Sequence, residues 1–86
     1  MKINNDYVLK HALDSDILVN IKNNGNFIIK LNSTSKDIFN YIKDGKAKEE
    51  IIDLLSKDYD ISKDTLINDV DSFINEMIEK KIFIND

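Results

Sequence analysis

The sequence contains no cysteine, no proline and no arginine, and it has only two glycines. Without cysteine, the chain can form neither a disulfide framework nor a cysteine-ligated zinc or iron–sulfur site. Gly25 and Gly45 are isolated from each other, so no glycine-rich loop is present that could cradle a phosphate. The 86 residues suffice for one small domain with a modest core. We therefore predict a single domain over residues 1–86, in which the polar residues 1–6 are flexible.

Positive charge is also scarce. The formal net charge is −4, and all twelve basic residues are lysine. DNA-binding proteins normally neutralise phosphates with clustered Lys and Arg and read bases with Arg. No apolar run is long enough to span a bilayer, and none follows Met1 as in a signal peptide. We expect a cytoplasmic protein with neither a nucleic-acid nor a membrane partner.

The first third of the chain has the two-residue alternation of β-strands. Polar turn residues separate three such stretches, at Asp14-Ser15-Asp16 and at Asn23-Asn24-Gly25. The pattern predicts a three-stranded antiparallel meander whose third strand lies at an edge, with strands over Tyr7–Leu13, Ile17–Lys22 and Asn26–Leu31.

The register between the second and third strands depends on the length of the loop around Gly25. A two-residue loop would pair Val19 with Lys30 and place a lysine on the apolar face. A three-residue loop with a bulge at Gly25 pairs Val19 with Ile29 instead. We favour the second register, because it turns Ile17, Val19 and Ile21 inward together with Phe27, Ile29 and Leu31.

The rest of the chain has the amphipathic period of helices. Asn32 and the residues after it, and later Ser62, provide side-chain oxygens suited to cap a first turn. We predict an α+β fold in which three helices and a short terminal strand follow the sheet, over about Ser33–Lys43, Ala47–Asp58, Ser62–Lys80 and Ile82–Ile84.

No group of residues resembles a catalytic or metal site. His11 is the sole histidine, and no nucleophile and orienting carboxylate are arranged around it in the sequence. The carboxylates near Tyr59-Asp60-Ile61 lack the central glycine and terminal glutamate of a calcium-binding loop. We predict no catalytic residue, no metal, no cofactor and no enzymatic activity.

The long third helix and the edge strand suggest a binding site. An apolar stripe such as that of Phe73 and Met77 is most often core. If this helix packs beside an edge strand that carries Phe27 and Ile29, however, a groove forms between them. Its one wall offers unpaired backbone groups and the other apolar side chains, an arrangement that captures an extended peptide as an added strand.

A succession of short motifs supports this hypothesis. Each is weak alone, but their order and spacing resemble the PqqD family, the small domain also called the RiPP recognition element, over Tyr7–Ile84. The motifs are Leu31-Asn32-Ser33-Thr34, Ile38-Phe39-Asn40-Tyr41-Ile42, Asp44-Gly45, Glu50-Ile51-Ile52-Asp53-Leu54-Leu55, Tyr59-Asp60-Ile61 and Asp69-Val70-Asp71-Ser72-Phe73-Ile74-Asn75-Glu76-Met77.

The resemblance implies a winged helix-turn-helix fold with three strands and three helices. It implies a non-catalytic adaptor that binds the leader of a ribosomally made precursor peptide and presents it to a modifying enzyme, often a radical SAM enzyme. In the family the leader adds to the third strand beside the third helix. From the periodicity we predict that the contacting side chains here are Phe27, Ile28, Ile29, Lys30, Asp69, Val70, Phe73 and Met77.

The chain departs from the family pattern at two positions. Lys81 replaces a glycine that usually follows the third helix, and Lys46-Ala47-Lys48 lacks the usual capping threonine before the second helix. Two other functions stay open from the sequence. One is a winged-helix DNA-binding regulator, although an acidic third helix would be repelled by phosphate. The other is a small structural subunit of an enzyme complex. The third strand's edge could also pair with a second copy.

Overall fold

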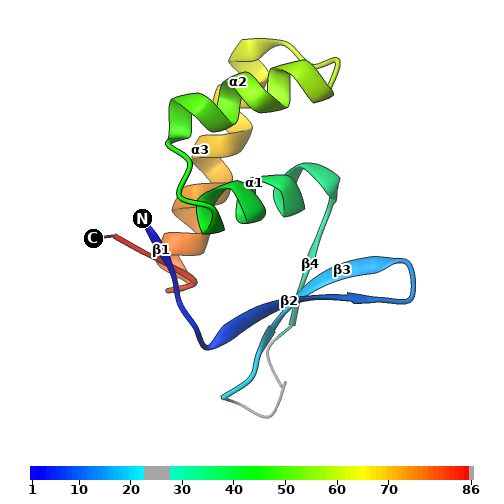
Figure 1. Ribbon diagram of the computed structural model, residues 1–86, viewed down its shortest axis with the longest axis vertical. Helices are drawn as coiled ribbons and strands as arrows, with labels where there is room; N and C mark the ends of the chain where they lie inside the picture. Colours follow the sequence, from blue (N-terminus) through cyan, green and yellow to red (C-terminus); the bar gives the residue numbers. More distant parts are fainter. Residues whose placement is uncertain (23–27, 86) are drawn as a thin grey trace.

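The computed structural model describes residues 1–22 and 28–85. It contains a three-stranded antiparallel sheet, followed along the chain by three helices that lie on one side of it (Figure 1). This confirms the predicted α+β fold. The elements are β1 (Lys2–Ile3), β2 (Tyr7–Ala12), β3 (Ser15–Asn20), β4 (Ile28–Leu31), α1 (Ser33–Lys43), α2 (Lys48–Asp58), α3 (Lys63–Glu79) and β5 (Phe83–Ile84).

The β2–β3 hairpin is tighter than the sequence suggested. Ala12 pairs with Ser15, so the loop is Leu13-Asp14 and β3 begins two residues earlier than predicted. Leu13 takes a positive φ of 55° at the tip, where it is almost fully exposed. Beside the loop, His11 Nδ1 lies 3.0 Å from Asp16 Oδ1. This hydrogen bond is the main reason why the pKa of Asp16 is lowered, and nearby Lys36 lowers it further.

The predicted register between β3 and β4 is wrong. The structure pairs Ile17 with Lys30 and Leu18 with Ile29, one residue away from the register that we favoured. Leu18, which we had turned outward, is the fully buried residue of β3. The misassignment has a simple cause: Ile17, Leu18 and Val19 are all apolar, so alternation alone cannot identify the inner face. Of the predicted third strand, residues 26 and 27 lie outside the described residues.

The helices begin and end close to the predicted positions. Asn32 accepts a hydrogen bond from the Ser35 N–H at 2.8 Å, and Ser62 accepts one from the Thr65 N–H at 3.3 Å. Each satisfies one of the N–H groups that a helix start leaves without an intrahelical partner. Ala47 occupies the N-cap position of α2, where the usual threonine is missing, and makes no side-chain hydrogen bond to the helix.

The end of α3 explains how Lys81 can stand where the resemblance implies a glycine. Lys81 has a positive φ of 62°, and its N–H donates to the Ile78 carbonyl. The Ile82 N–H donates to the Met77 carbonyl at 2.8 Å, which completes a Schellman motif. Ile82 and Met77 are both buried, so the apolar contact that accompanies this motif is available as well. The left-handed position is thus kept, although its residue has a side chain.

A two-stranded sheet joins the two ends of the chain. Lys2 pairs with Ile84 and Ile3 with Phe83, and the Asn4 N–H donates to the Ile82 carbonyl at 2.8 Å. The terminal strand was predicted, but its partner β1 was not, because residues 1–6 had been assigned to a flexible end. Two-residue strands have too little alternation to be recognised in a sequence.

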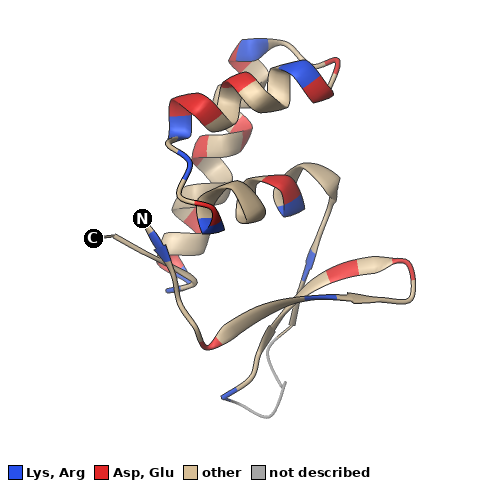
Figure 2. Cartoon of the chain, in the orientation of Figure 1, with Lys and Arg blue, Asp and Glu red and all other residues tan. Residues whose placement is uncertain are grey.

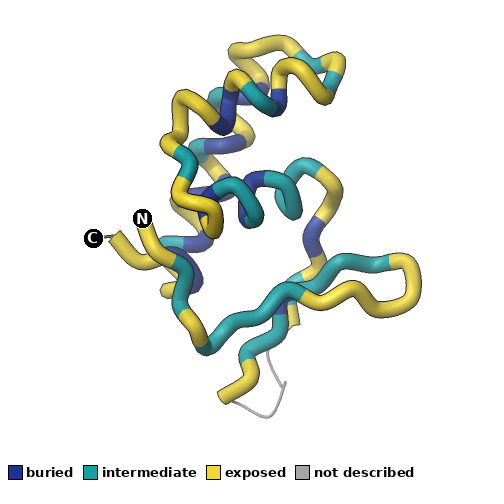
Figure 3. The backbone as a smooth tube through the Cα atoms, viewed as in Figure 1, coloured by how far each residue is buried: buried dark blue, intermediate teal, exposed yellow. Residues whose placement is uncertain are grey.

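The core lies between the helices and the inner face of the sheet (Figure 3). At its centre three phenylalanines form a chain: the ring centroid of Phe83 is 6.0 Å from that of Phe39 and 5.9 Å from that of Phe73. At the periphery, the Tyr59 hydroxyl donates to Asp37 Oδ2 at 2.7 Å, which ties the end of α2 to α1. This hydrogen bond, with burial, raises the pKa of Tyr59. In the part of the chain that is described, no helix has the length and apolar character needed to cross a membrane.

Candidate functional site

Among the described strands, β4 is an edge of the main sheet, as predicted. Its inner residues, Ile29 and Leu31, pack against the core, whereas Ile28 is 57% exposed and Lys30 is exposed. The strand is followed directly by α1, and side chains from the N-terminal half of α1 and the middle of α3 line a common hollow. An extended peptide could therefore approach β4 along a side that no described strand occupies.

The alternation of hydrogen-bonded pairs in the sheet shows which backbone groups of β4 face outward. The Ile21 N–H donates to the Asp6 carbonyl at 2.8 Å, so every second pair from there along the β2–β3 hairpin is a hydrogen-bonded pair. Antiparallel alternation then directs Leu18 of β3 toward Ile29 of β4. The backbone N–H and C=O groups of Ile28 and Lys30 consequently point away from the sheet. These two residues offer the strand-pairing groups of this edge.

A hollow of about 300 Å³ lies where β4 enters α1, with α3 as its far wall. Its floor is apolar, formed by the buried residues Ile38 and Phe73. The rim is polar and contains two carboxylates, Asp69 and Glu76, of which Glu76 is 2.7 Å from the ammonium group of Lys80. The hollow can accept an apolar side chain, and Asp69 at its rim favours a neighbouring positive charge.

The residues predicted from periodicity are only partly brought together here. Phe73 and Asp69 line the hollow, and the β4 residues form the adjacent edge. Val70 and Met77 are covered by the chain itself and belong to the core. Phe27 lies outside the described residues. Ile38 and Thr34 also line the hollow; both belong to the motifs quoted above, but neither was predicted as a peptide contact.

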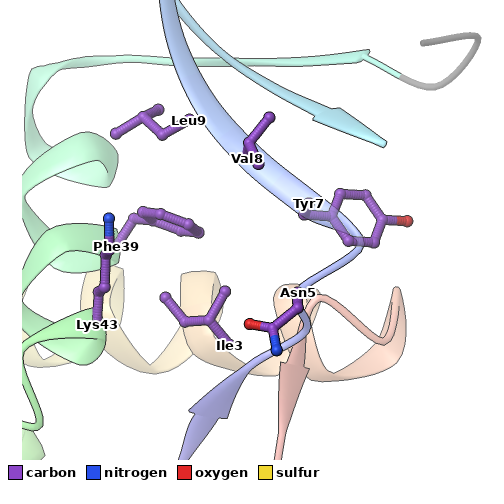
Figure 4. Close-up of a pocket in the computed structure, with 7 residues that line it drawn as sticks. All are labelled: Ile3, Asn5, Tyr7, Val8, Leu9, Phe39 and Lys43. Carbon is purple, nitrogen blue, oxygen red and sulfur yellow. The ribbon is translucent and has the colours of Figure 1, made fainter. Parts of the chain in front are cut away.

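A larger hollow, of about 430 Å³, lies near the opposite edge strand, β2 (Figure 4). It is mainly apolar, and Figure 4 shows Phe39 and Leu9 on its two sides with Lys43 at the end of α1. This hollow was not predicted from the sequence, because one of its walls is Ile3, in the unpredicted strand β1. Its lining residues are Ile3, Asn5, Tyr7, Val8, Leu9, Phe39 and Lys43.

Comparison with known proteins places the chain in a family. A family model described as coenzyme PQQ synthesis protein D (PqqD) matches residues 17–82. The chain belongs to the PqqD family. No curated protein matches the chain.

Among solved structures, the PqqD-family chain is similar to one titled "TbiB1 in Complex with the TbiA(beta) Leader Peptide". The two chains share 24% sequence identity, and the TM-score is 0.80 over 99% of this chain and 100% of the other. This similarity extends over the entire domain, including β1 and β5, and supports the arrangement described above.

Proposed function

We propose that this PqqD-family protein is a non-catalytic adaptor that binds the leader segment of a ribosomally synthesised precursor peptide and presents it to a modifying enzyme. The observation that carries the proposal is the edge strand β4, with the outward backbone groups of Ile28 and Lys30, next to a hollow that has an apolar floor and a polar rim. The structural relative's title names a leader peptide as the partner of a chain with the same fold.

The leader would lie as a fourth strand against β4, and main-chain pairing would contribute most of its affinity. Its residue opposite Ile29 would face the inner side, toward the hollow floored by Ile38 and Phe73. A basic leader side chain near the rim would find Asp69, and an acidic one near the outer face would find Lys30. Such partly exposed ion pairs contribute only about 0–1 kcal/mol each. The predicted peptide contacts of Val70, Met77 and Phe27 stay part of the proposal, the first two as support beneath the floor.

The charge of α3 favours this function over DNA binding. Its exposed surface carries Asp64, Asp69, Glu76 and Glu79, while Lys63 is paired with Asp53 at 3.3 Å. A recognition helix of this charge would be repelled by phosphates.

The direct test is a fluorescence-polarisation titration with the labelled leader of the precursor on which the protein acts. We expect saturable binding that is lost when the apolar residues of the leader are replaced by Ser. The matched protein variant is Phe73→Leu, which changes the floor of the hollow while keeping most of its apolar volume. Thermal unfolding of that variant controls for damage to the fold.

Undiminished affinity of both the Ser-substituted leader and a folded Phe73→Leu variant would contradict the proposal. Sedimentation velocity with and without leader adds a second check. If β4 instead pairs with a second copy, the leader should dissociate that dimer, because both partners need the same edge.

A further inference from the structure

The hollow at the β2 edge has a second hollow next to it. The second hollow, of about 350 Å³, shares Ile3, Asn5 and Lys43 with the first and extends past Lys2 to the end of α1. The two hollows are neighbours on the surface between β1, β2 and α1, and we name this surface the β2–α1 groove. The proposed leader site uses none of the residues that line it.

The β2–α1 groove is positively charged in an acidic protein. Among the described residues, neither Lys2 nor Lys43 has an ion-pair partner, and no carboxylate lines either hollow. Asp6, the nearest carboxylate to β2 in the sequence, lies 3.5 Å from the ammonium group of Lys22. Figure 2 shows the lysines of β1 and of the end of α1 on the same side of the molecule. The charge is thus complementary to an acidic group next to an apolar one.

Strand β2, beside the groove, also has backbone groups that can pair with an added strand. By the alternation that begins at the Asp6–Ile21 hydrogen bond, Leu9 and His11 of β2 direct their N–H and C=O groups away from β3. In the part of the sheet that is described, β2 is an edge strand. An extended segment lying here could pair with the backbone and at the same time place a side chain over Phe39.

A second copy of this chain does not fit the groove well. Two copies that met through the same surface would be related by a two-fold axis, which would bring each copy's Lys2 and Lys43 close to those of the other. Like charges at close approach oppose that contact, whereas an acidic segment of a different protein is attracted.

We infer that the β2–α1 groove docks an extended segment of the modifying enzyme, in which an apolar side chain fills the hollow and a neighbouring Asp or Glu pairs with Lys43. This inference rests on the proposed adaptor function, because an adaptor must hold the leader and the enzyme simultaneously. With the leader on β4 and the enzyme on β2, the two partners occupy opposite edges of one sheet and do not compete.

The test compares Lys43→Glu with Lys57→Glu. Lys43 and Lys57 both stand in the last turn of a helix, so both reversals remove a similar interaction with the helix dipole. Only Lys43 lines the groove. The probe is the purified modifying enzyme that acts on the same precursor, titrated by biolayer interferometry against the immobilised adaptor. Leader affinity is measured in parallel by fluorescence polarisation.

We expect Lys43→Glu to weaken enzyme binding about tenfold at low salt, while Lys57→Glu changes it less than about twofold. Both variants should bind the leader like the wild type. Equal enzyme affinity of the two variants would overturn the inference, and so would a wild-type chain that does not bind the enzyme. A change of self-association caused by Lys43→Glu alone would assign the groove to a second copy and also overturn it.

If the proposed adaptor function is wrong, the same measurements give a different result. A wild-type chain that binds the enzyme but no leader would refute the proposed function, while the Lys43 comparison would still decide whether the groove holds the enzyme. Loss of leader binding in Lys43→Glu would mean that the two edges are not independent, and would overturn the assignment of separate sites.

A crosslinking experiment identifies the segment directly. Because the chain has no cysteine, Asn5→Cys would carry its only thiol, at an exposed position that lines both hollows. A photoactivatable reagent on this thiol should attach to an enzyme peptide that contains an acidic residue beside an apolar one. Lys57→Cys serves as the control. Attachment to the same peptide from both positions, or to a peptide without an acidic residue, would contradict the inference.

Discussion

The two edges of the main sheet present the same backbone chemistry in opposite electrostatic surroundings. At β4 the adjacent hollow has carboxylates on its rim, Asp69 and Glu76, whereas at β2 the adjacent hollow has Lys43 and no carboxylate. Strand pairing at an edge is nearly independent of side chains, so it cannot by itself distinguish one extended segment from another. The helix surface placed beside each edge supplies that distinction. A single small sheet can therefore present two sites that select different partners.

Phe83 lines neither hollow but packs in the core against one aromatic residue of each, and its truncation should have the largest effect. Its ring is 1% exposed and contacts Phe39 of the β2–α1 groove on one side and Phe73 of the leader hollow on the other. We expect Phe83→Ala to lower the free energy of unfolding by about 3–5 kcal/mol, measured by urea denaturation. Phe83→Leu, which keeps most of the volume, should cost clearly less. An equal loss in the two variants would show that volume is not what Phe83 contributes.

A pair of proline substitutions distinguishes the role of β4 in leader binding from that of β2. Lys30→Pro removes an outward N–H of β4 and should weaken leader binding about tenfold or more, because a main-chain hydrogen bond is lost and the ring crowds the added strand. His11→Pro removes the equivalent outward N–H of β2 and should leave leader affinity unchanged. Fluorescence polarisation measures both, and far-UV circular dichroism checks the sheet. A comparable loss in both variants would mean that the leader does not select the β4 edge.

Lys81→Gly should change the stability of the end of α3 without altering the edge strands β2 and β4. A left-handed residue with a Cβ is unfavourable by about 1–2 kcal/mol compared with glycine, and Lys81 has a φ of 62° at the end of α3. We expect the free energy of unfolding to rise by about 1 kcal/mol. Leader and enzyme affinities should stay the same. A lower melting temperature would show that the Lys81 side chain stabilises the helix end by contacts that outweigh its backbone strain.

Charge reversal at the rim of the leader hollow should have a smaller effect. We expect Asp69→Lys to weaken the binding of a leader that carries a basic residue by about 0–1 kcal/mol, and the loss should shrink at high salt. Isothermal titration calorimetry at two salt concentrations measures this. The matched control is Asp64→Lys on the first turn of the same helix, which lines no described hollow.

Acidification should lower the stability of the fold through the β2–β3 hairpin. The pKa of Asp16 is below its ordinary value of 3.8, chiefly through its hydrogen bond with His11. A carboxyl with a lowered pKa in the folded state stabilises the fold above its unfolded pKa and loses this contribution as the pH falls through the folded pKa. The melting temperature of the wild type should therefore fall more between pH 5 and pH 2 than that of Asp16→Asn. Parallel pH profiles of the two proteins would contradict this assignment.

The helices were predictable because their signals are local. Capping side chains such as Ser62 and an apolar stripe along each helix are contained within one segment of sequence. The strand register and β1 depended on contacts between distant segments. Ile17-Leu18-Val19 is compatible with either face of a sheet, and Lys2–Ile3 becomes a strand only because β5 lies next to it. Among the candidate site residues, the period of α3 identified an apolar stripe but not which of its members border a hollow. Val70 was therefore grouped with Phe73, although both are buried and only Phe73 also floors a hollow.

The pairing of β1 with β5 places the first and the last strand of the domain side by side (Figure 1). A host polypeptide that continues from Lys2 and Ile84 needs only a gap as wide as one strand pair to accommodate the entire fold. Domains with adjacent ends tolerate insertion into surface loops of other proteins. Grafted in this way into an enzyme, the domain would turn its groove beside Ile3 toward the host and present β4, at the other edge of the sheet, to an incoming chain.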